Sequence, residues 1–462
     1  MAQSTIEQAK TTSLGWLEKN NAHFSKISRD IWEFAELGLH EFKSSDLLVS
    51  QLESNGFTVE RGQARMPTAF VGTYNYGSGK PVIGIMAEYD ALPGLDPKET
   101  GKPGHGCGHN LYGTGATAAA IAVKEAMAKH HIDGTIKLFG TPSEDTHGGK
   151  MWMAREHVFD GYDAILSWHP MDQNKTGWGG MLANQLLEID FHGRSAHAGT
   201  VPEKGRSALD ALQIFTIACE FLREHMIEPM RIHYIFTAAG EAPNSVPAFA
   251  RCRMAVRGPT MIEVEQLRSR DGGIDDCAQA GALATGTQVE IKIRGAFWED
   301  IVNRTGAYLL YDNMKAIGAP KFTDKEKAFA KSKGYDFIDE TIYEPDDIKT
   351  KASHDTGEVS WVTPLISVRA ACAPKGTPGH SFDSATFYGM SIGQKGMMFA
   401  AKIQAATSLD LMMDVEKLKA VTTERKERIE SLPPYHVVPL ADSWPPIPKE
   451  NPPDFQGPPP PA

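Results

Sequence analysis

Cysteine is scarce in this sequence. Five cysteines occur in 462 residues, widely separated and with no Cys-x-x-Cys pair, at positions 107, 219, 252, 277 and 372. A disulfide framework is therefore not expected, and a reducing compartment is favoured. Positive charge is also in deficit, because 47 Lys and Arg face 58 Asp and Glu, for a net charge of −11. This balance, without a basic cluster, argues against a nucleic-acid partner.

Long apolar runs are missing as well. No stretch approaches the ~18 uninterrupted apolar residues of a membrane-spanning helix, and the first residues show no basic segment followed by an apolar core. We therefore expect a cytoplasmic protein with no membrane partner. The composition, 41% hydrophobic and 23% charged, is typical of a globular chain, and the length predicts more than one structural unit.

Strand and helix patterns alternate in the first part of the chain. Apolar runs predict strands ending near residue 86 and at 135–139 and 163–168, and helices at 111–130 and 150–158. This alternation predicts an α/β fold with a mainly parallel mixed sheet flanked by helices. The turn residues 76–79 separate two further β-type runs, 69–74 and 81–86, and predict a hairpin there.

A different pattern begins near residue 183. Residues 183–296 have the order β-α-β-β-α-β, which predicts an inserted ferredoxin-like α+β domain. The first domain would then consist of residues 1–182 and 297–432. Residues 433–462 are rich in proline, which excludes a helix or a sheet interior there. This tail could lie on the domain as a strap or form a loose polyproline segment.

The loop GHGCGHN, residues 104–110, contains the first candidate metal ligands. Cys107 and His109 offer a thiolate and an imidazole two residues apart, and the glycines between and around them let the backbone bring both donors together. One Cys-x-His pair is weak evidence by itself, because a glycine-rich turn with a solvated histidine has the same sequence.

Further donors follow the ends of other predicted strands. Glu144 and Asp145 come after the strand at 135–139, where neighbouring carboxylates could divide the roles of base and metal ligand. His169 ends the strand at 163–168, and His380 follows an apolar run at 365–371. Because open α/β sheets place their sites at the carboxyl ends of strands, these residues could meet. Together with Cys107 and His109 they supply enough donors for two metal ions.

The same segments resemble a known family. The matching strings are WEFAELG (32–38), AEYDALPG (87–94), GHGCGHN (104–110), GTPSED (140–145), GGKMWMARE (148–156), WHP (168–170), GRSAHAG (193–199) and residues 355–361. They span nearly the whole chain, and in this order they are similar to the M20 family of metallopeptidases and amidohydrolases. The resemblance is to the branch of aminoacylases, auxin-conjugate hydrolases and p-aminobenzoyl-glutamate hydrolases.

The resemblance implies a role for each candidate residue. Glu144 would be the catalytic base, His197 would polarise the scissile carbonyl, often in the site of a partner subunit, and Asn244 would contact the substrate. Asp90 would contact the metal ligands, and not the metal ions, and so hold these ligands in place. The metal ligands would be Cys107, as the bridging thiolate, with His109, Asp145, His169 and His380. The family usually has Glu where Asp145 stands.

These roles predict hydrolysis of an amide bond between an aromatic or apolar acyl group and an amino acid. The cofactors would be two divalent ions, zinc or manganese. The substrate would be a small N-acyl amino acid, such as p-aminobenzoyl-glutamate, and the inserted domain would act as a lid and join two chains in a homodimer. Two alternatives stay open: a metal-dependent deaminase of an aromatic amine, and a metal-free scaffold of the same fold.

Overall fold

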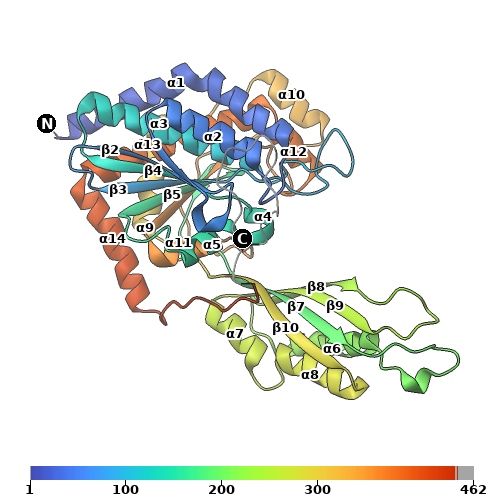
Figure 1. Ribbon diagram of the computed structural model, residues 1–462. Coiled ribbons are helices and arrows are strands. Elements are labelled where there is room, and N and C mark those ends of the chain that lie inside the picture. Colours follow the sequence, from blue (N-terminus) through green and yellow to red (C-terminus); the bar gives the residue numbers. More distant parts are fainter. Residues whose placement is uncertain (1, 443–444, 446–462) are drawn as a thin grey trace.

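The computed structural model describes residues 2–442 and residue 445, which form two β-sheets with their covering helices (Figure 1). The larger sheet has seven strands in the order β1-β2-β4-β3-β5-β11-β6. Its four central strands, β4, β3, β5 and β11, run parallel to one another, and each of the outer strands β1, β2 and β6 pairs antiparallel with its inner neighbour. The strands are β1 (Thr58–Arg61), β2 (Phe70–Tyr76), β3 (Val82–Ala87), β4 (Gly134–Gly140), β5 (Ala164–Met171), β6 (Lys175–Thr176) and β11 (Leu365–Ala371).

Helices cover both faces of this sheet, because its central strands are apolar on both sides. Along β5, Leu166 packs in one core with α1, α3 and α13, whereas the preceding Ile165 packs in a second core with α5 and α11. The helices around this sheet are α1 (Ala2–Phe34), α2 (Phe42–Ser54), α3 (His109–His130), α4 (Glu144–His147), α5 (Gly149–Arg155), α9 (Arg304–Ile317), α10 (Asp324–Ser332), α11 (Thr356–Val362), α12 (Phe382–Tyr388), α13 (Ser391–Met413) and α14 (Val415–Glu430). The prediction of an α/β fold with a mainly parallel mixed sheet is confirmed.

The predicted hairpin at residues 76–79 is wrong. The turn does join β2 to β3, but β4 lies between these strands, antiparallel to β2 and parallel to β3. The connection of residues 77–81 passes over the start of β4, where the Thr135 hydroxyl donates to the Gly79 carbonyl at 2.7 Å. Crossing one strand requires ~10 Å, which five extended residues can easily span. Turn residues alone therefore did not determine which strands pair.

The smaller sheet is formed by residues 183–297, called the small unit from here on. Its strands are antiparallel in the order β10-β7-β9-β8 and follow the expected β-α-β-β-α-β sequence, except that two helices, α7 and α8, replace the second helix. The elements are β7 (Ala183–His192), α6 (Ala208–Leu222), β8 (Arg231–Ala238), β9 (Phe249–Gly258), α7 (Met261–Ser269), α8 (Ile274–Thr285) and β10 (Gln288–Phe297). The unit has a hydrophobic core of its own and extends away from the larger sheet (Figure 1).

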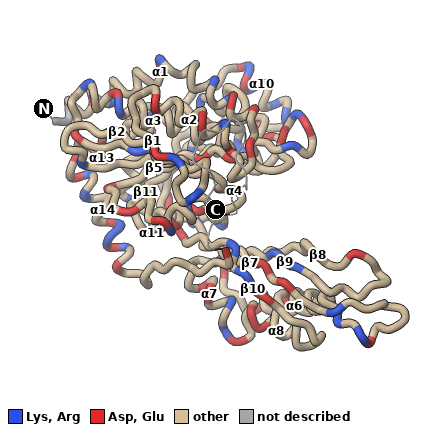
Figure 2. Tube along the Cα trace, in the orientation of Figure 1, with Lys and Arg blue, Asp and Glu red and all other residues tan. Residues whose placement is uncertain are grey.

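Part of the predicted proline-rich tail packs on the protein. Tyr435 lies against Trp298 and Trp361, with ring centroids 5.2 and 5.8 Å apart, and Val438 is buried. Residues 443, 444 and 446–462 of that tail lie outside the described residues. Basic and acidic residues are interspersed along the chain in both units, as Figure 2 shows. Among the described residues, no helix has the length and apolar character needed to cross a bilayer.

Candidate metal centre

The loop before α3 brings Cys107 and His109 together. Gly108, between them, has a left-handed backbone with φ of 83°. A Cβ atom there would lie 2.9 Å from the ring of Tyr388 and 3.0 Å from Pro170, so both the conformation and the space require glycine. Helix α3 begins at His109, directly after this turn. The glycine thus places both side chains at the same edge of the sheet, as the sequence predicted.

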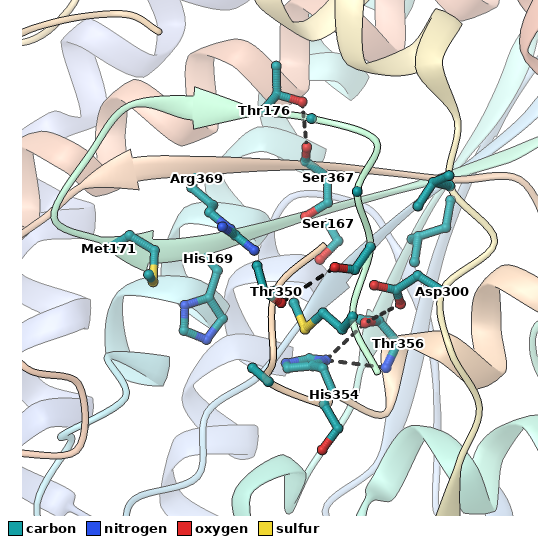
Figure 3. A pocket seen from close by; sticks show the side chains of 18 of the residues that line it. Ser167, His169, Met171, Thr176, Asp300, Thr350, His354, Thr356, Ser367 and Arg369 are labelled. Carbon is teal, nitrogen blue, oxygen red and sulfur yellow. Dashed lines mark hydrogen bonds between the residues drawn. The ribbon is translucent and has the colours of Figure 1, made fainter. Parts of the chain in front are cut away.

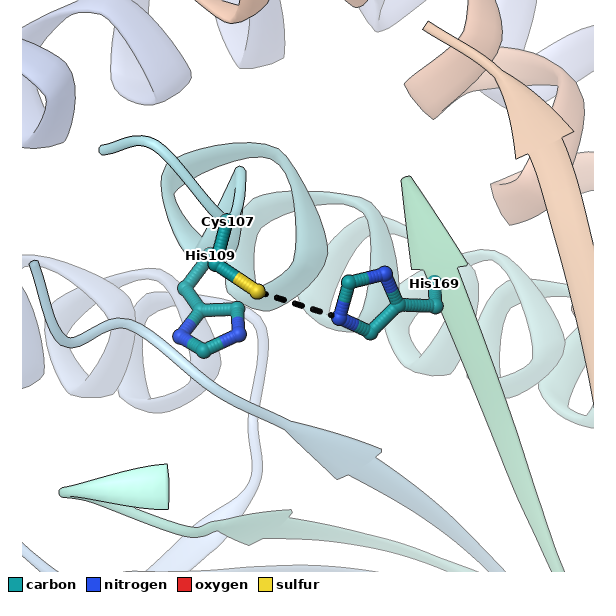
Figure 4. Close-up of side chains that lie close together, drawn as sticks. All are labelled: Cys107, His109 and His169. Atoms are coloured by element: carbon teal, nitrogen blue, oxygen red, sulfur yellow. Dashed lines mark hydrogen bonds between the residues drawn. The ribbon is translucent and has the colours of Figure 1, made fainter. Parts of the chain in front are cut away.

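Three of the predicted ligands form one compact cluster. The ligand atoms of Cys107, His109 and His169 all lie within 4.8 Å of one another, and Cys107 Sγ is 3.5 Å from His169 Nε2 (Figure 4). A second set of donor atoms within the same limit consists of Cys107, His109, Glu144 and Asp145. The cluster lies beyond the carboxyl ends of β3 and β4 and beside the end of β5, which is the usual location of sites in open α/β sheets.

Fixed acceptors orient both imidazoles. Asp90 Oδ1 lies 2.8 Å from His109 Nδ1, and its other oxygen accepts from the backbone N–H of Asp145 at 3.0 Å. The carbonyl of Pro170 lies 2.9 Å from His169 Nδ1. With Nδ1–H donating in each ring, Nε2 is the nitrogen that faces the cluster. Burial lowers the pKa of His169 to about 3, so this ring is neutral, as a metal ligand must be.

His380 approaches the cluster from the β11 side of β5, opposite to the side of β3 and β4. It follows β11, and its Nε2 lies 3.5 Å from Asp145 Oδ1. Its backbone N–H donates to the Gly106 carbonyl at 3.2 Å, which ties this loop to the loop that carries Cys107. The His380 side chain is 56% exposed, in contrast to the fully buried His109. His380 therefore lies at the solvent-facing side of the cluster.

His197 and Asn244 lie elsewhere in this chain. Both are in loops of the small unit, where the Ala198 N–H donates to the Asn244 carbonyl at 2.9 Å and Ser245 bridges to His197. Both side chains are outside the set of residues that line the cavity of the metal cluster. A single chain does not bring these two residues to the other candidates.

The sequence reasoning did not identify a buried ion network behind the cluster. Lys150 Nζ lies 2.6 Å from both Glu88 Oε1 and Asp355 Oδ1, and all three side chains are 0% exposed. His354 Nε2 lies 3.3 Å from Glu144 Oε1 and 3.5 Å from Glu88 Oε1. The only available signals were three charged residues inside recognised motifs, Glu88, Lys150 and Asp355, since charged residues are ordinarily expected at the surface.

The network determines the charge of its members. Burial opposes the charged form of His354, but the neighbouring Glu144 and Glu88 raise its pKa to about 9. Burial would raise the pKa of Glu88, yet the charges of Lys150, His354 and His109 hold it well below its usual range. For Glu144, burial prevails over the attraction of His354 and raises the pKa to about 8. Glu144 can therefore hold or release a proton near neutral pH.

The polar atoms of the cluster suit a cation. His109 Nε2 and Asp145 Oδ2 are buried, have no hydrogen-bond partner among the described residues and belong to residues whose donor atoms form one set. Buried polar atoms are normally satisfied, and unsatisfied ones that converge on one point indicate an absent ion or water. Thiolate, imidazole and carboxylate are the donors that zinc and manganese accept. The residues present therefore fit a metal centre.

The cluster opens into a cavity of about 530 Å³ (Figure 3). Cys107, Glu144, Asp145, His169 and His380 line one end of it. The remaining wall mixes polar and charged side chains, Arg369 among them, with the aliphatic side chains of Met171, Ile301, Val302, Ile348, Leu365 and Ile366. A volume of this size accommodates a small ligand. The fold and this site define an α/β protein with a candidate metal centre that opens into a ligand-sized cavity.

Comparison with known proteins identifies the family. The model of peptidase family M20/M25/M40 matches residues 84–403, and the chain therefore belongs to this family. It is 36% identical to one of the subunits of the p-aminobenzoyl-glutamate hydrolase of Escherichia coli, over 91% of this chain and 95% of that protein. It is 25% identical to the human Xaa-Arg dipeptidase, over 93% and 94% of the two chains.

A solved structure shares the fold. The crystal structure of a Bacillus subtilis protein, titled a dinuclear metal binding peptidase from the M20 family, superposes with a TM-score of 0.54. The superposition covers 83% of this chain and 98% of the other, at 16% sequence identity. The resemblance to the M20 family that the motifs indicated is confirmed, and the chain is an enzyme of this hydrolase family.

Proposed function

We propose that this protein hydrolyses the amide bond between an aromatic or apolar acyl group and an amino acid, with p-aminobenzoyl-glutamate as the first candidate substrate. The main support is the cluster of Cys107, His109, Asp145 and His169 beside Glu144 at one end of a cavity that has aliphatic side chains in its wall. The names of both relatives, a p-aminobenzoyl-glutamate hydrolase and a dipeptidase, denote cleavage of an amide bond to an amino acid. The aliphatic wall would hold the acyl group.

Two divalent ions, zinc or manganese, would be held by Cys107 as the shared ligand and by His109, Asp145, His169 and His380. Support comes from the converging donors and from the B. subtilis structure, which is described as a dinuclear metal binding peptidase. When bound, such ions supply Lewis-acid polarisation of a carbonyl and lower the pKa of a water molecule. Burial, with the charge of Asp145 second, raises the pKa of the Cys107 thiol, so metal binding at this residue would release a proton.

Glu144 would transfer the proton during hydrolysis. Its carboxylate takes a proton from the attacking water, holds it in the buried site and returns it to the leaving nitrogen. The raised pKa of about 8 favours the protonated form at the stage when the proton must be kept. His354, 3.3 Å away, orients the carboxylate through its Nε2. Asp90 holds the ring of His109 and the backbone of Asp145, and so fixes two ligands relative to each other.

A homodimer through the small unit would complete the site. His197 and Asn244 do not line the cavity of their own chain. Both residues would instead contribute to the site of a partner chain. The small unit has an unpaired edge strand, β8, with exposed Ile235 and Phe236, and the outer face of α6 exposes Phe221. Exposed apolar side chains on an edge strand and an adjacent helix are typical of an interface. The E. coli relative is named as a subunit, so a heteromer is the alternative partner.

The test is the pair of variants Glu144→Gln and Asp145→Asn, assayed with p-aminobenzoyl-glutamate. Glu144→Gln is expected to keep its metal and lose roughly 10²-fold or more in turnover, since general-base catalysis contributes about that much. Asp145→Asn is the matched control, in which metal content itself is expected to fall. Release of free glutamate supports the proposal, whereas release of ammonia would indicate the deaminase alternative. Unchanged turnover in Glu144→Gln would remove Glu144 from the mechanism.

A further inference from the structure

The cavity contains an arginine, Arg369, that has no counter-ion among the described residues. Arg369 lies on β11, in register with His169 of the neighbouring parallel strand β5. Side chains in register on adjacent strands point to the same face and start ~4.8 Å apart. Arg369 therefore lines the same cavity as the metal ligands and lies one strand away from them, as Figure 3 shows.

Among residues 2–442 and 445, no hydrogen bond or ion pair joins the Arg369 guanidinium to another group. The three acids whose charges act on it from a distance each have another partner. Asp346 accepts from Lys175 at 2.5 Å, Asp172 from the Gly376 N–H at 2.8 Å, and Asp300 from the Thr356 hydroxyl at 3.4 Å. Burial lowers the pKa of Arg369, although these acids oppose the shift. A guanidinium largely removed from water without a partner is costly, and an anionic ligand would offset that cost.

We propose that Arg369 binds the α-carboxylate of the amino-acid half of the substrate. This assignment rests on the proposed function. In an N-acyl amino acid, the α-carboxylate is separated from the scissile amide nitrogen by a single carbon atom. Its anchor must therefore lie next to the metal ligands, and Arg369, beside His169, is in that position. The planar guanidinium can donate two parallel hydrogen bonds to a carboxylate, which also fixes the orientation of the amide.

The other cations of the cavity are less suited to this role. Lys175 faces Arg369 across the antiparallel pair of β6 and β11, but it is already neutralised by Asp346. Arg257 also has no counter-ion among the described residues, but it belongs to β9 of the small unit rather than to a strand beside His169, and it donates to the Lys351 carbonyl at 3.4 Å. Arg369 is thus the cation that combines proximity to the metal ligands with a free charge. The enzyme would therefore select substrates by a free α-carboxylate as well as by an apolar acyl group.

The test compares two substrates, p-aminobenzoyl-glutamate and its analogue with a carboxamide in place of the α-carboxylate. For Arg369→Gln, kcat/KM for the acid is expected to fall about 10²-fold, mostly through KM, because a charged hydrogen-bond pair is lost. The value for the carboxamide should change less than about threefold. Arg369→Lys, which keeps the charge without the paired donors, should recover part of the loss. Metal content and melting temperature of each variant establish that the site is intact.

Lys175→Gln is the matched control, because it removes the neighbouring cation that is already paired. It is expected to change both substrates by the same factor. Equal losses on both substrates in Arg369→Gln would overturn the proposal, as would an acid-specific loss that appears in Arg257→Gln instead. If the unaltered protein hydrolyses neither substrate, the proposed function fails, and calorimetric binding of p-aminobenzoyl-glutamate to the metal-loaded protein decides on Arg369. Weaker binding to Arg369→Gln then supports it, and equal or absent binding overturns it.

Discussion

Replacing Lys150 by Met is expected to destabilise the protein strongly. Lys150 is the only cation within 2.6 Å of both Glu88 Oε1 and Asp355 Oδ1 in the described part of the chain, and none of the three side chains is exposed. Met has a similar length, so the change removes charge and leaves the packing nearly intact. Loss of one partner from a buried ion pair costs about 3–5 kcal/mol. We expect the upper half of that range, because two carboxylates lose their cation at once.

The assay is the free energy of unfolding of the metal-free protein, extrapolated from urea denaturation. The triple variant Lys150→Met, Glu88→Gln, Asp355→Asn is the matched control. It should recover much of the loss, because it removes the charges of Glu88 and Asp355 together with the charge of Lys150. The pKa of Glu88 is held below the ordinary 4.5 in the native protein. The stability that this ion pairing contributes is therefore present above pH 4.5 and is lost as the pH falls through the lower native pKa of Glu88. At that low pH, the difference in free energy of unfolding between Lys150→Met and the unaltered protein should become smaller.

A Lys150→Met protein within about 1 kcal/mol of the unaltered one would refute this reasoning, since a loss of several kcal/mol is the expected consequence of uncompensated buried charge. That result would mean that water or other groups compensate the charges of Glu88 and Asp355 when Lys150 is absent. A triple variant as unstable as Lys150→Met would equally contradict it, because the loss would then come from packing.

Two further predictions concern pH dependence and assembly. Burial raises the pKa of Glu358 from 4.5 to about 7, so its contribution to stability is complete below pH 4.5 and is lost as the pH rises to about 7. The free energy of unfolding, measured by urea denaturation at each pH, should fall by ~3 kcal/mol over this range in the unaltered protein and should not show this fall in Glu358→Gln. Parallel plots of the free energy of unfolding against pH for the two proteins would contradict the prediction. Inactive Glu144→Gln and His197→Ala chains, mixed and reassembled, should regain about a quarter of the unaltered activity, since half of randomly paired dimers contain one intact site. No recovery would show that His197 does not act in a partner's site.

The positions of most strands and helices could be predicted from the sequence, because apolar periodicity is a local property. The run at 365–371, for example, coincides with β11. Strand pairing is not local, and so the predicted hairpin failed where β4 separates β2 from β3. The boundaries of the predicted domains and the cytoplasmic location stay predictions.

The site was predictable in part for a similar reason. Cys107, His109, Asp145 and His169 each follow or end a strand, and parallel strands bring such residues to one edge. The network of Glu88, Lys150, His354 and Asp355 could not be found in the same way, because its members are charged residues that become buried only through tertiary packing. Nor does sequence spacing tell that His197 lies on a unit that extends away from its own chain's cavity.

The central claim is that five side chains from four separate segments hold two metal ions. Anomalous X-ray diffraction from crystals grown with zinc or manganese measures this most directly. We expect two peaks ~3.5–4 Å apart, with Cys107 Sγ between them at ~2.3 Å from a zinc ion. His109, Asp145, His169 and His380 should complete the coordination. A map with no peak inside this cluster, or with ions bound only elsewhere, would contradict the account.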